Sequence, residues 1–156
     1  MSFDFEQTLA DNQSRIRAIA WHYADVGHSD DLYQEILLQL WRSRHSYKSR
    51  SSVSTWIYKV ALNTAFTFQR KSIRQRKIHE QALSVSLSEH AEGGYSDGEI
   101  LGLFMQQLND VDKSVLIMYL DGIPAAGISE TLGLSANAIN VRVNRLKSRF
   151  EEQFIS

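Results

Sequence analysis

Residues 36–79 read ILLQLWRSRHSYKSRSSVSTWIYKVALNTAFTFQRKSIRQRKIH and contain no acidic residue. The stretch carries ten basic side chains, which are Arg42, Arg44, Lys48, Arg50, Lys59, Arg70, Lys71, Arg74, Arg76 and Lys77. It also carries six aromatic ones, Trp41, Tyr47, Trp56, Tyr58, Phe66 and Phe68. Basic groups bind phosphates and aromatic rings stack on unpaired bases. Together they predict a nucleic-acid-binding segment.

The charges outside this stretch also lie in blocks. Residues 1–35 hold seven acids and two bases, residues 80–134 nine acids and one base, and residues 135–156 four bases and two acids. The formal net charge of -1 therefore hides two basic blocks, each preceded by an acidic one. This asymmetry predicts two separate contact surfaces for a polyanion, with other faces left for a different partner.

The composition indicates a soluble all-α protein. Of 156 residues, one is proline, eight are glycine and 43% are hydrophobic, with few alternating runs typical of strands. The absence of cysteine, of a signal-like N-terminus and of any long apolar run leads us to expect a cytoplasmic protein that does not enter the membrane. The histidines do not have metal-ligand spacing, and no glycine-rich phosphate loop or nucleophile set stands out, so we expect no metal, cofactor or enzymatic activity.

Helical periodicity divides the chain into two small domains, residues 1–79 and 98–156, joined by a flexible linker over residues 80–97. In the first domain we expect a helix over residues 4–26, a second helix capped by Ser29 or Asp30, and a third that starts at Ser51 or Ser52 and runs to about Lys77. In the second we expect helices over 98–108 and 110–121, the latter capped by Asp110, then one from Pro124 to Gly133 and a last one from Ala136, capped by Ser135, to Phe154.

The segment from Ile123 to Phe150 has the layout of a helix-turn-helix. If Ile139, Val143 and Leu146 face the core, the outward positions of the last helix are Asn137, Asn140, Val141, Asn144 and Arg145. Such positions enter the major groove in these motifs, where asparagine can read adenine and arginine can hold guanine or phosphate. A packed helical bundle without DNA contacts fits the same pattern.

Three motifs, taken together and in order, resemble a known family. Residues 31–41 (DLYQEILLQLW), residues 54–63 (STWIYKVALN) and the Arg-rich tail that follows are similar to region two of bacterial sigma factors of the extracytoplasmic-function group. Residues 108–150 are similar to region four of the same group, with no third region between them. The resemblance implies a promoter-specificity subunit of bacterial RNA polymerase.

The resemblance also implies partners and site residues. Core RNA polymerase would be bound through the clamp helices of its β′ subunit and the flap of its β subunit, and the side chains at the first of these contacts would be Asp31, Gln34, Glu35, Leu38 and Trp41. Promoter DNA would be opened and held by Tyr47, Lys48, Tyr58, Lys59, Asn63, Arg70, Lys71 and Arg74, with a base extruded from the stack. The upstream element would be read by Asn137, Asn140, Val141, Arg142, Asn144 and Arg145. The linker would allow an anti-sigma protein to clamp the two domains.

The sequence departs from the family pattern at three places. Asn140 stands where a basic residue is common, Thr67 replaces an acid, and Ala126-Gly127 replaces an acidic pair. A glycine inside a helix costs about 1 kcal/mol relative to alanine, so Gly127 needs a reason.

Two other functions fit parts of the chain. Residues 98–156 alone would make a stand-alone helix-turn-helix regulator. A chain whose last helix binds the major groove only weakly, through Asn140 and Val141, would instead mimic a sigma factor and sequester its partners. A stand-alone regulator has no use for an acidic second helix or an aromatic third one, and this favours the sigma subunit.

Overall fold

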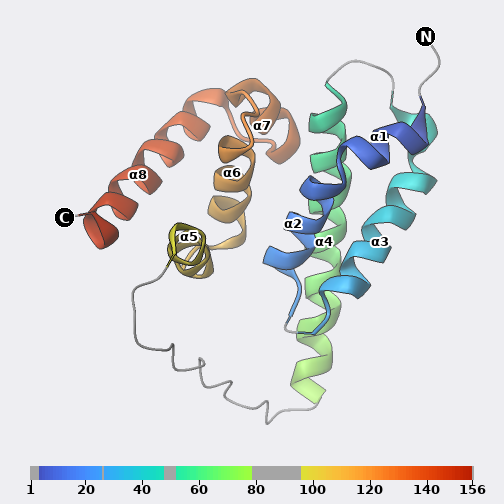
Figure 1. The fold of residues 1–156 in the computed structure, drawn as a ribbon, viewed down its shortest axis with the longest axis horizontal. Coiled ribbons are helices and arrows are strands. Elements are labelled where there is room, and N and C mark those ends of the chain that lie inside the picture. Colours follow the sequence, from blue (N-terminus) through green and yellow to red (C-terminus); the bar gives the residue numbers. More distant parts are fainter. Residues whose placement is uncertain (1–3, 26, 48–51, 79–95, 156) are drawn as a thin grey trace.

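The computed structural model of the chain describes residues 4–25, 27–47, 52–78 and 96–155, with side chains described as far as residue 69 in the third range. Within these ranges every regular element is helical, which confirms the expected all-α fold (Figure 1). The elements are α1 (Phe5–Asp11), α2 (Gln13–Tyr23), α3 (Ser29–Arg42), the short 3-10 helix η1 (Arg44–Ser46), α4 (Val53–Ile78), α5 (Asp97–Gln106), α6 (Asp110–Leu120), α7 (Ala125–Leu132) and α8 (Ala136–Phe154).

The first predicted helix is wrong in one respect, because it is two helices broken at Asn12. Asn12 leaves helical geometry (φ -116, ψ 12), and its backbone N–H donates to the carbonyl of Leu9 at 3.2 Å. Its side-chain amide donates to the carbonyl of Thr8 and its side-chain oxygen accepts from Arg15. Asparagine competes with helical hydrogen bonding in this way and favours helix ends, which periodicity alone does not detect.

Two of the predicted N-cap residues are confirmed and two are wrong. Ser52 and Ser135 accept from the backbone N–H of Thr55 and Ala138, both at 3.1 Å, which confirms these two caps. The predicted cap of α3, Ser29 or Asp30, was one or two residues late, and that of α6, Asp110, was one residue late. His28 is the N-cap residue of α3, without a side-chain bond, and Asn109 caps α6 by accepting from the N–H of Asp112 at 2.8 Å.

The C-terminal helices form the expected helix-turn-helix. Between α7 and α8, Gly133 adopts a left-handed conformation (φ 75) that suits glycine and turns the chain. Ile139, Val143 and Leu146 are buried on the inner face of α8 as predicted. Phe104 of α5 meets Phe150 and Phe154 edge-on, with ring centroids 5.3 and 6.3 Å apart, so α5 closes the far end of this group.

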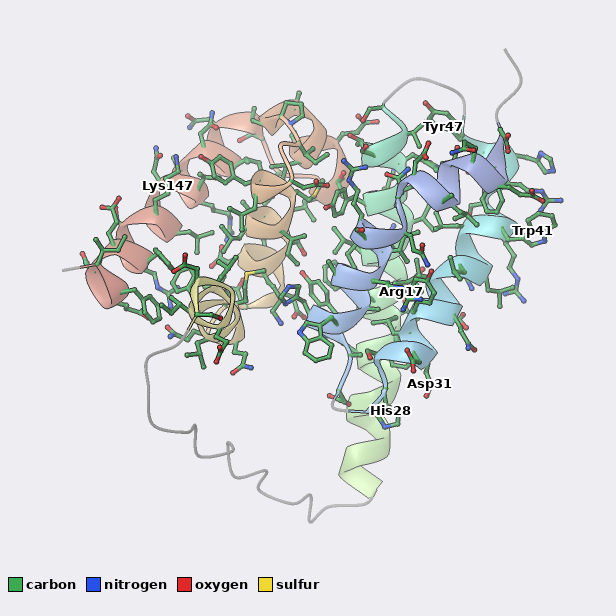
Figure 2. The ribbon with its side chains drawn as sticks, viewed as in Figure 1. Arg17, His28, Asp31, Trp41, Tyr47 and Lys147 are labelled. Atoms are coloured by element: carbon green, nitrogen blue, oxygen red, sulfur yellow. The ribbon has the colours of Figure 1, made fainter. Side chains whose placement is uncertain are left out.

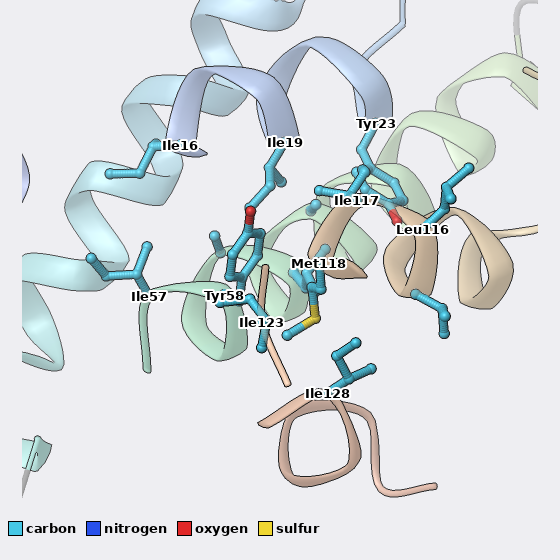
Figure 3. Packing of buried hydrophobic residues seen from close by; sticks show 14 of the residues in the cluster. Ile16, Ile19, Tyr23, Ile57, Tyr58, Leu116, Ile117, Met118, Ile123 and Ile128 are labelled. Atoms are coloured by element: carbon cyan, nitrogen blue, oxygen red, sulfur yellow. The ribbon is translucent and has the colours of Figure 1, made fainter. Parts of the chain in front are cut away.

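The two groups of helices, α1 to α4 and α5 to α8, contact each other directly. In Figure 1, α7 lies beside α4, and the two helices are in contact. Figure 3 shows where they meet: side chains such as Ile19 and Tyr58 from the first group lie with Met118 and Ile128 from the second in one hydrophobic core. The sequence predicted two independent domains joined by a flexible linker. That linker lies largely outside the described residues. The direct packing was not anticipated.

Gly127 of α7 lies at this contact. A Cβ at this position would lie 2.9 Å from Cγ2 of Ile123 and 3.0 Å from Oγ1 of Thr55 on α4. Both separations are too short for a methyl group without movement. The glycine that was unexplained in the sequence therefore allows α7 to approach α4.

Candidate functional site

The outer face of α3 presents an acidic and apolar stripe. Asp31, Gln34, Leu38 and Trp41 recur at intervals of three and four residues, which puts them on one side of the helix, and all four are exposed. Figure 2 shows Asp31 and Trp41 on the side of the N-terminal group that is turned away from α8. Trp41 is 50% exposed, although its ring contacts the ring of Phe5 and the guanidinium of Arg44, which is 3.6 Å from the ring centroid. Such a large exposed aromatic suits a protein contact.

A polar groove of about 370 Å³ lies along the surface where α3 and α4 meet. Its lining consists of Glu35, Gln39, Asn63, Thr64, Thr67 and Phe68. Glu35 accepts a hydrogen bond from the Gln39 amide at 3.0 Å, while Asn63 is exposed across the groove. The structure thus brings a predicted polymerase contact, Glu35, next to a predicted DNA contact, Asn63.

The N-terminal end of α4 holds some of the other predicted DNA contacts. Lys59 is exposed one turn before Asn63. The ring of Tyr47 is half-buried with its centroid 5.5 Å from that of Trp56, and Trp56 belongs to the core. Lys48 and the side chains of Arg70, Lys71 and Arg74 lie outside the part of the chain that the structure describes.

Tyr58 lies in the contact between the two groups of helices, where it is only 2% exposed. Its hydroxyl donates to Oδ2 of Asp121 at 2.7 Å, and Arg15 of α2 donates to the same oxygen. Burial raises the pKa of the Tyr58 hydroxyl, and the bond to Asp121 raises it further. The bond to Asp121 likewise raises the pKa of Arg15. In this arrangement Tyr58 cannot touch DNA, and its predicted role requires the two groups to separate.

The outer face of α8 carries the predicted groove contacts together. Asn137, Asn140, Val141, Asn144 and Arg145 are all exposed on the N-terminal two thirds of the helix. Arg142 lies beside them with its guanidinium 2.7 Å from Asp112 of α6. This ion pair directs Arg142 toward the body of the domain, so phosphate binding by Arg142 would compete with it.

An apolar groove of about 420 Å³ lies between α5, α6 and α8, and the sequence did not predict it. It is lined by Leu101, Phe104, Leu116, Tyr119, Leu120, Leu146, Phe150 and Ile155, with Asp97, Lys147 and Glu151 also along it. Tyr119 and Leu120 are exposed along it, Leu120 to 53%. The sequence did contain a signal for this groove, because α6 has apolar residues on more than one face. Such a helix has two apolar surfaces, and only one of them is needed for the core.

Residues 4–25, 27–47, 52–78 and 96–155 contain no group of three metal-ligating side chains. No helix in the same ranges is long and apolar enough to span a bilayer.

Comparison with known proteins now identifies the family. Residues 9–75, which run from α1 into α4, match Sigma-70 region 2. The ECF RNA polymerase sigma-E factor of Escherichia coli (strain K12) is 30% identical to the chain over 132 residues, covering 81% of this chain and 68% of that protein. The chain belongs to the extracytoplasmic-function (ECF) sigma factors.

Other relatives extend the match over nearly the whole sigma factor. The ECF sigma-E factor of Haemophilus influenzae is 20% identical over 164 residues, covering 96% of this chain and 86% of that protein. The fold is similar to that of a chain in a co-crystal structure of the sigma factor RpoE with the anti-sigma factor NepR from Bartonella quintana, with a TM-score of 0.80 and 22% identity over 96% of this chain and 95% of that one. The predicted function as a promoter-specificity subunit in transcription initiation is confirmed. Sigma factors are not themselves enzymes.

Proposed function

We propose that this sigma factor docks on the β′ clamp helices of core RNA polymerase through the outer face of α3. The observation that carries this assignment is the exposed stripe Asp31, Gln34, Leu38 and Trp41 on a helix face that the C-terminal group does not cover. The carboxylate of Asp31 there would attract a basic partner, and Leu38 and Trp41 would supply the apolar centre that stable protein contacts need.

Promoter DNA is read by two other surfaces. Lys59 and Asn63 of α4, with the polar groove beside them, are suited to a phosphate and an unstacked base. The outer face of α8, with three asparagines and Arg145, is suited to base edges in a major groove. Two separated DNA surfaces on one chain support recognition of two promoter elements.

The apolar groove between α5, α6 and α8 is proposed as the binding site for the flap of the polymerase β subunit. It lies toward the C-terminal half of α8, away from Asn137 to Asn144, so flap and DNA could be bound together. Leu120 and Ile155 at its edge are more than half exposed, and covering them would release water from apolar surface.

Docking can be tested by charge reversal. Purified chain carrying D31K and E35K is mixed with core polymerase, and binding is compared with wild type and with the E6K variant, which alters an exposed acid on α1. We expect the double variant to lose about tenfold or more in affinity and E6K to behave as wild type. Unchanged core binding by the double variant would place the docking face elsewhere.

Selection of transcribed promoters from a random DNA library with the same mixture would separate a sigma subunit from a stand-alone regulator. A sigma subunit yields transcripts that start at a fixed distance from a shared motif. A regulator binds DNA without core and yields none.

We also propose that the sigma factor acts in the cytoplasm, where the polymerase is, and that a protein of the anti-sigma class is one of its partners. The second proposal is supported by the likeness to the Bartonella quintana sigma factor, which was crystallised with NepR.

A further inference from the structure

We propose that Asp112 of α6 withholds Arg142 of α8 from DNA and so limits the strength with which the last helix binds the phosphate backbone. This inference rests on the proposed function of α8, and it gives a role to a residue that lies outside the DNA-reading face. Its basis is the ion pair between the two side chains, in which Nη1 of Arg142 donates to Oδ1 of Asp112 at 2.7 Å.

Asp112 is fixed in place by the start of α6. It stands in the first turn of that helix, where its backbone N–H donates to the side-chain oxygen of Asn109 at 2.8 Å. A carboxylate in the first turn is also stabilised by the positive end of the helix dipole. The side chain of Asp112 is only 18% exposed, so its negative charge is held where α6 and α8 are in contact.

Arg142 lies at the border of the outer face of α8. Val141 before it and Arg145 one turn after it are exposed, whereas Val143 is buried. The side chain of Arg142 is 35% exposed, between these two extremes. A long, flexible arginine at such a border, once released from its partner, could reach a phosphate of a duplex bound to the outer face.

Two other basic residues of α8 also lie against the domain. The ammonium of Lys147 is 4.9 Å from the centroid of the Tyr119 ring, and the guanidinium carbon of Arg149 is 5.8 Å from that of Phe104. Cation–π contacts are weak at exposed sites, whereas separating an ion pair from a mostly buried carboxylate is costly. Of these three restraints on positive charge, the one supplied by Asp112 is therefore the strongest.

Moving Arg142 onto a phosphate would leave the carboxylate of Asp112 without its cation. Because that carboxylate is mostly shielded from water, hydration would not make up the loss, and the ion pair should persist when α8 binds DNA. A phosphate contact that is not made lowers the affinity and its dependence on salt, since fewer counterions are released. The upstream element is then bound more through base edges and less through attraction to DNA of any sequence.

Binding of holoenzyme to duplex DNA tests this restraint. The fragments carry a promoter selected from the random library, either intact or with its upstream element scrambled, at a temperature low enough to keep the strands paired. D112N keeps the shape of the side chain and removes its charge. We expect its affinity for both fragments to rise about fivefold at about 0.1 M salt. The slope of log affinity against log salt concentration should become steeper by about 0.9, the value of one added phosphate contact.

Three further variants separate the release of Arg142 from a simple loss of negative charge. D110N removes the same charge from the same turn of α6 and should bind as wild type. R142A alone should also bind nearly as wild type, and in D112N/R142A the gain caused by D112N should vanish. No gain in D112N, an equal gain in D110N, or a gain that persists in D112N/R142A would each overturn the proposal. A loss of about fivefold in R142A alone would do the same, because Arg142 would then already hold DNA.

The proposed function of α8 can fail separately. If wild-type holoenzyme binds the intact and the scrambled fragment equally, α8 does not read the upstream element. Elution of the full chain from heparin, a linear polyanion, then decides whether Asp112 withholds Arg142. D112N should elute at a higher salt concentration than wild type, and D112N/R142A should not. Equal elution of D112N and wild type would show that Arg142 is not held back.

Discussion

Asn63 is the residue that most directly connects the fold of the first half to promoter opening. It is exposed on α4 and lines the polar groove that α4 forms with α3. Its side-chain amide offers two donors and an acceptor, which is what an unstacked base edge requires. The neighbouring Thr67 hydroxyl donates to the backbone carbonyl of Asn63 at 3.0 Å, so Thr67 is engaged within the helix.

Replacing Asn63 by alanine should therefore impair strand opening more than initial binding to duplex DNA. We expect roughly a tenfold loss of open complex, because a captured base would leave its hydrogen bonds unmade. Permanganate reactivity of unpaired thymines measures opening, and mobility shift of the holoenzyme measures binding. T67A lines the same groove and is the control. Equal losses in both assays would mean that Asn63 acts in docking or folding instead.

Among the elements, the orientation of α8 depends on the residues at its N-terminus. Ser135 caps it and Gly133 turns the chain into it, so the first-turn Asn137 and Asn140 take their orientation from these two residues.

S135A should lower the free energy of unfolding by about 1 kcal/mol, the usual value of an N-cap hydroxyl. It should also weaken binding to the upstream element, since the first turn of α8 will fray. Urea denaturation measures the first effect and footprinting of the upstream element the second. S148A, at an exposed position inside α8, should change neither. A loss of stability without any change in the footprint would show that the first turn of α8 does not contribute to DNA recognition.

The helix α6 has two apolar faces with different uses. Met118 is fully buried in the contact with the N-terminal half, whereas Leu120 is exposed at the groove between α5, α6 and α8.

L120E should leave the fold intact, because the side chain is 53% exposed, and should weaken the proposed flap contact. We expect holoenzyme carrying L120E to lose protection of the upstream element while protection near the start site persists. V111E changes an exposed apolar residue of the same helix that does not line the groove, so it serves as the control. Identical footprints for L120E and wild type would exclude the groove as a polymerase contact.

For the whole molecule, His22 links the contact between the halves to pH. It lines two cavities that lie between the N-terminal and the C-terminal group of helices. The other charged and titratable residues that line them are Arg15, Asp25, Tyr58, Lys113 and Asp121. Burial lowers the pKa of His22 below its ordinary 6.5, and the charge of Lys113 lowers it further.

Because the pKa of His22 is lowered in the folded chain, folding favours the neutral imidazole. This contribution to the free energy of unfolding is present above pH 6.5 and is lost as the pH falls below that value, where the unfolded chain takes up the proton first. The free energy of unfolding, measured by urea denaturation, should therefore fall as the pH is lowered below 6.5, and H22Q should flatten that dependence. H45Q, at an exposed position on η1, should retain it. If H22Q showed the same pH dependence as wild type, that dependence would come from titratable groups other than His22.

Much of this molecule could be predicted from local patterns. The periodicity of α3, α4 and α8, the caps at Ser52 and Ser135 and the turn at Gly133 depend on neighbours within a few residues, so the sequence contains all that decides them. The exposed stripe of α3 and the outer face of α8 follow from the same geometry once the buried positions are known. Asn12 was missed because its effect on the backbone depends on its particular hydrogen bonds.

By itself, the sequence determined the all-α class, the helix-turn-helix and the family of this sigma factor, because these depend on short-range spacing and on motifs. Only the tertiary structure decided that Tyr58 is buried, that Asp121 joins it to Arg15, and that Gly127 is needed against Thr55. These contacts link residues far apart in the chain through groups that carry no periodic signal. Whether an aromatic side chain faces DNA or another helix depends on which surface packs over it, and packing is a property of the assembled molecule.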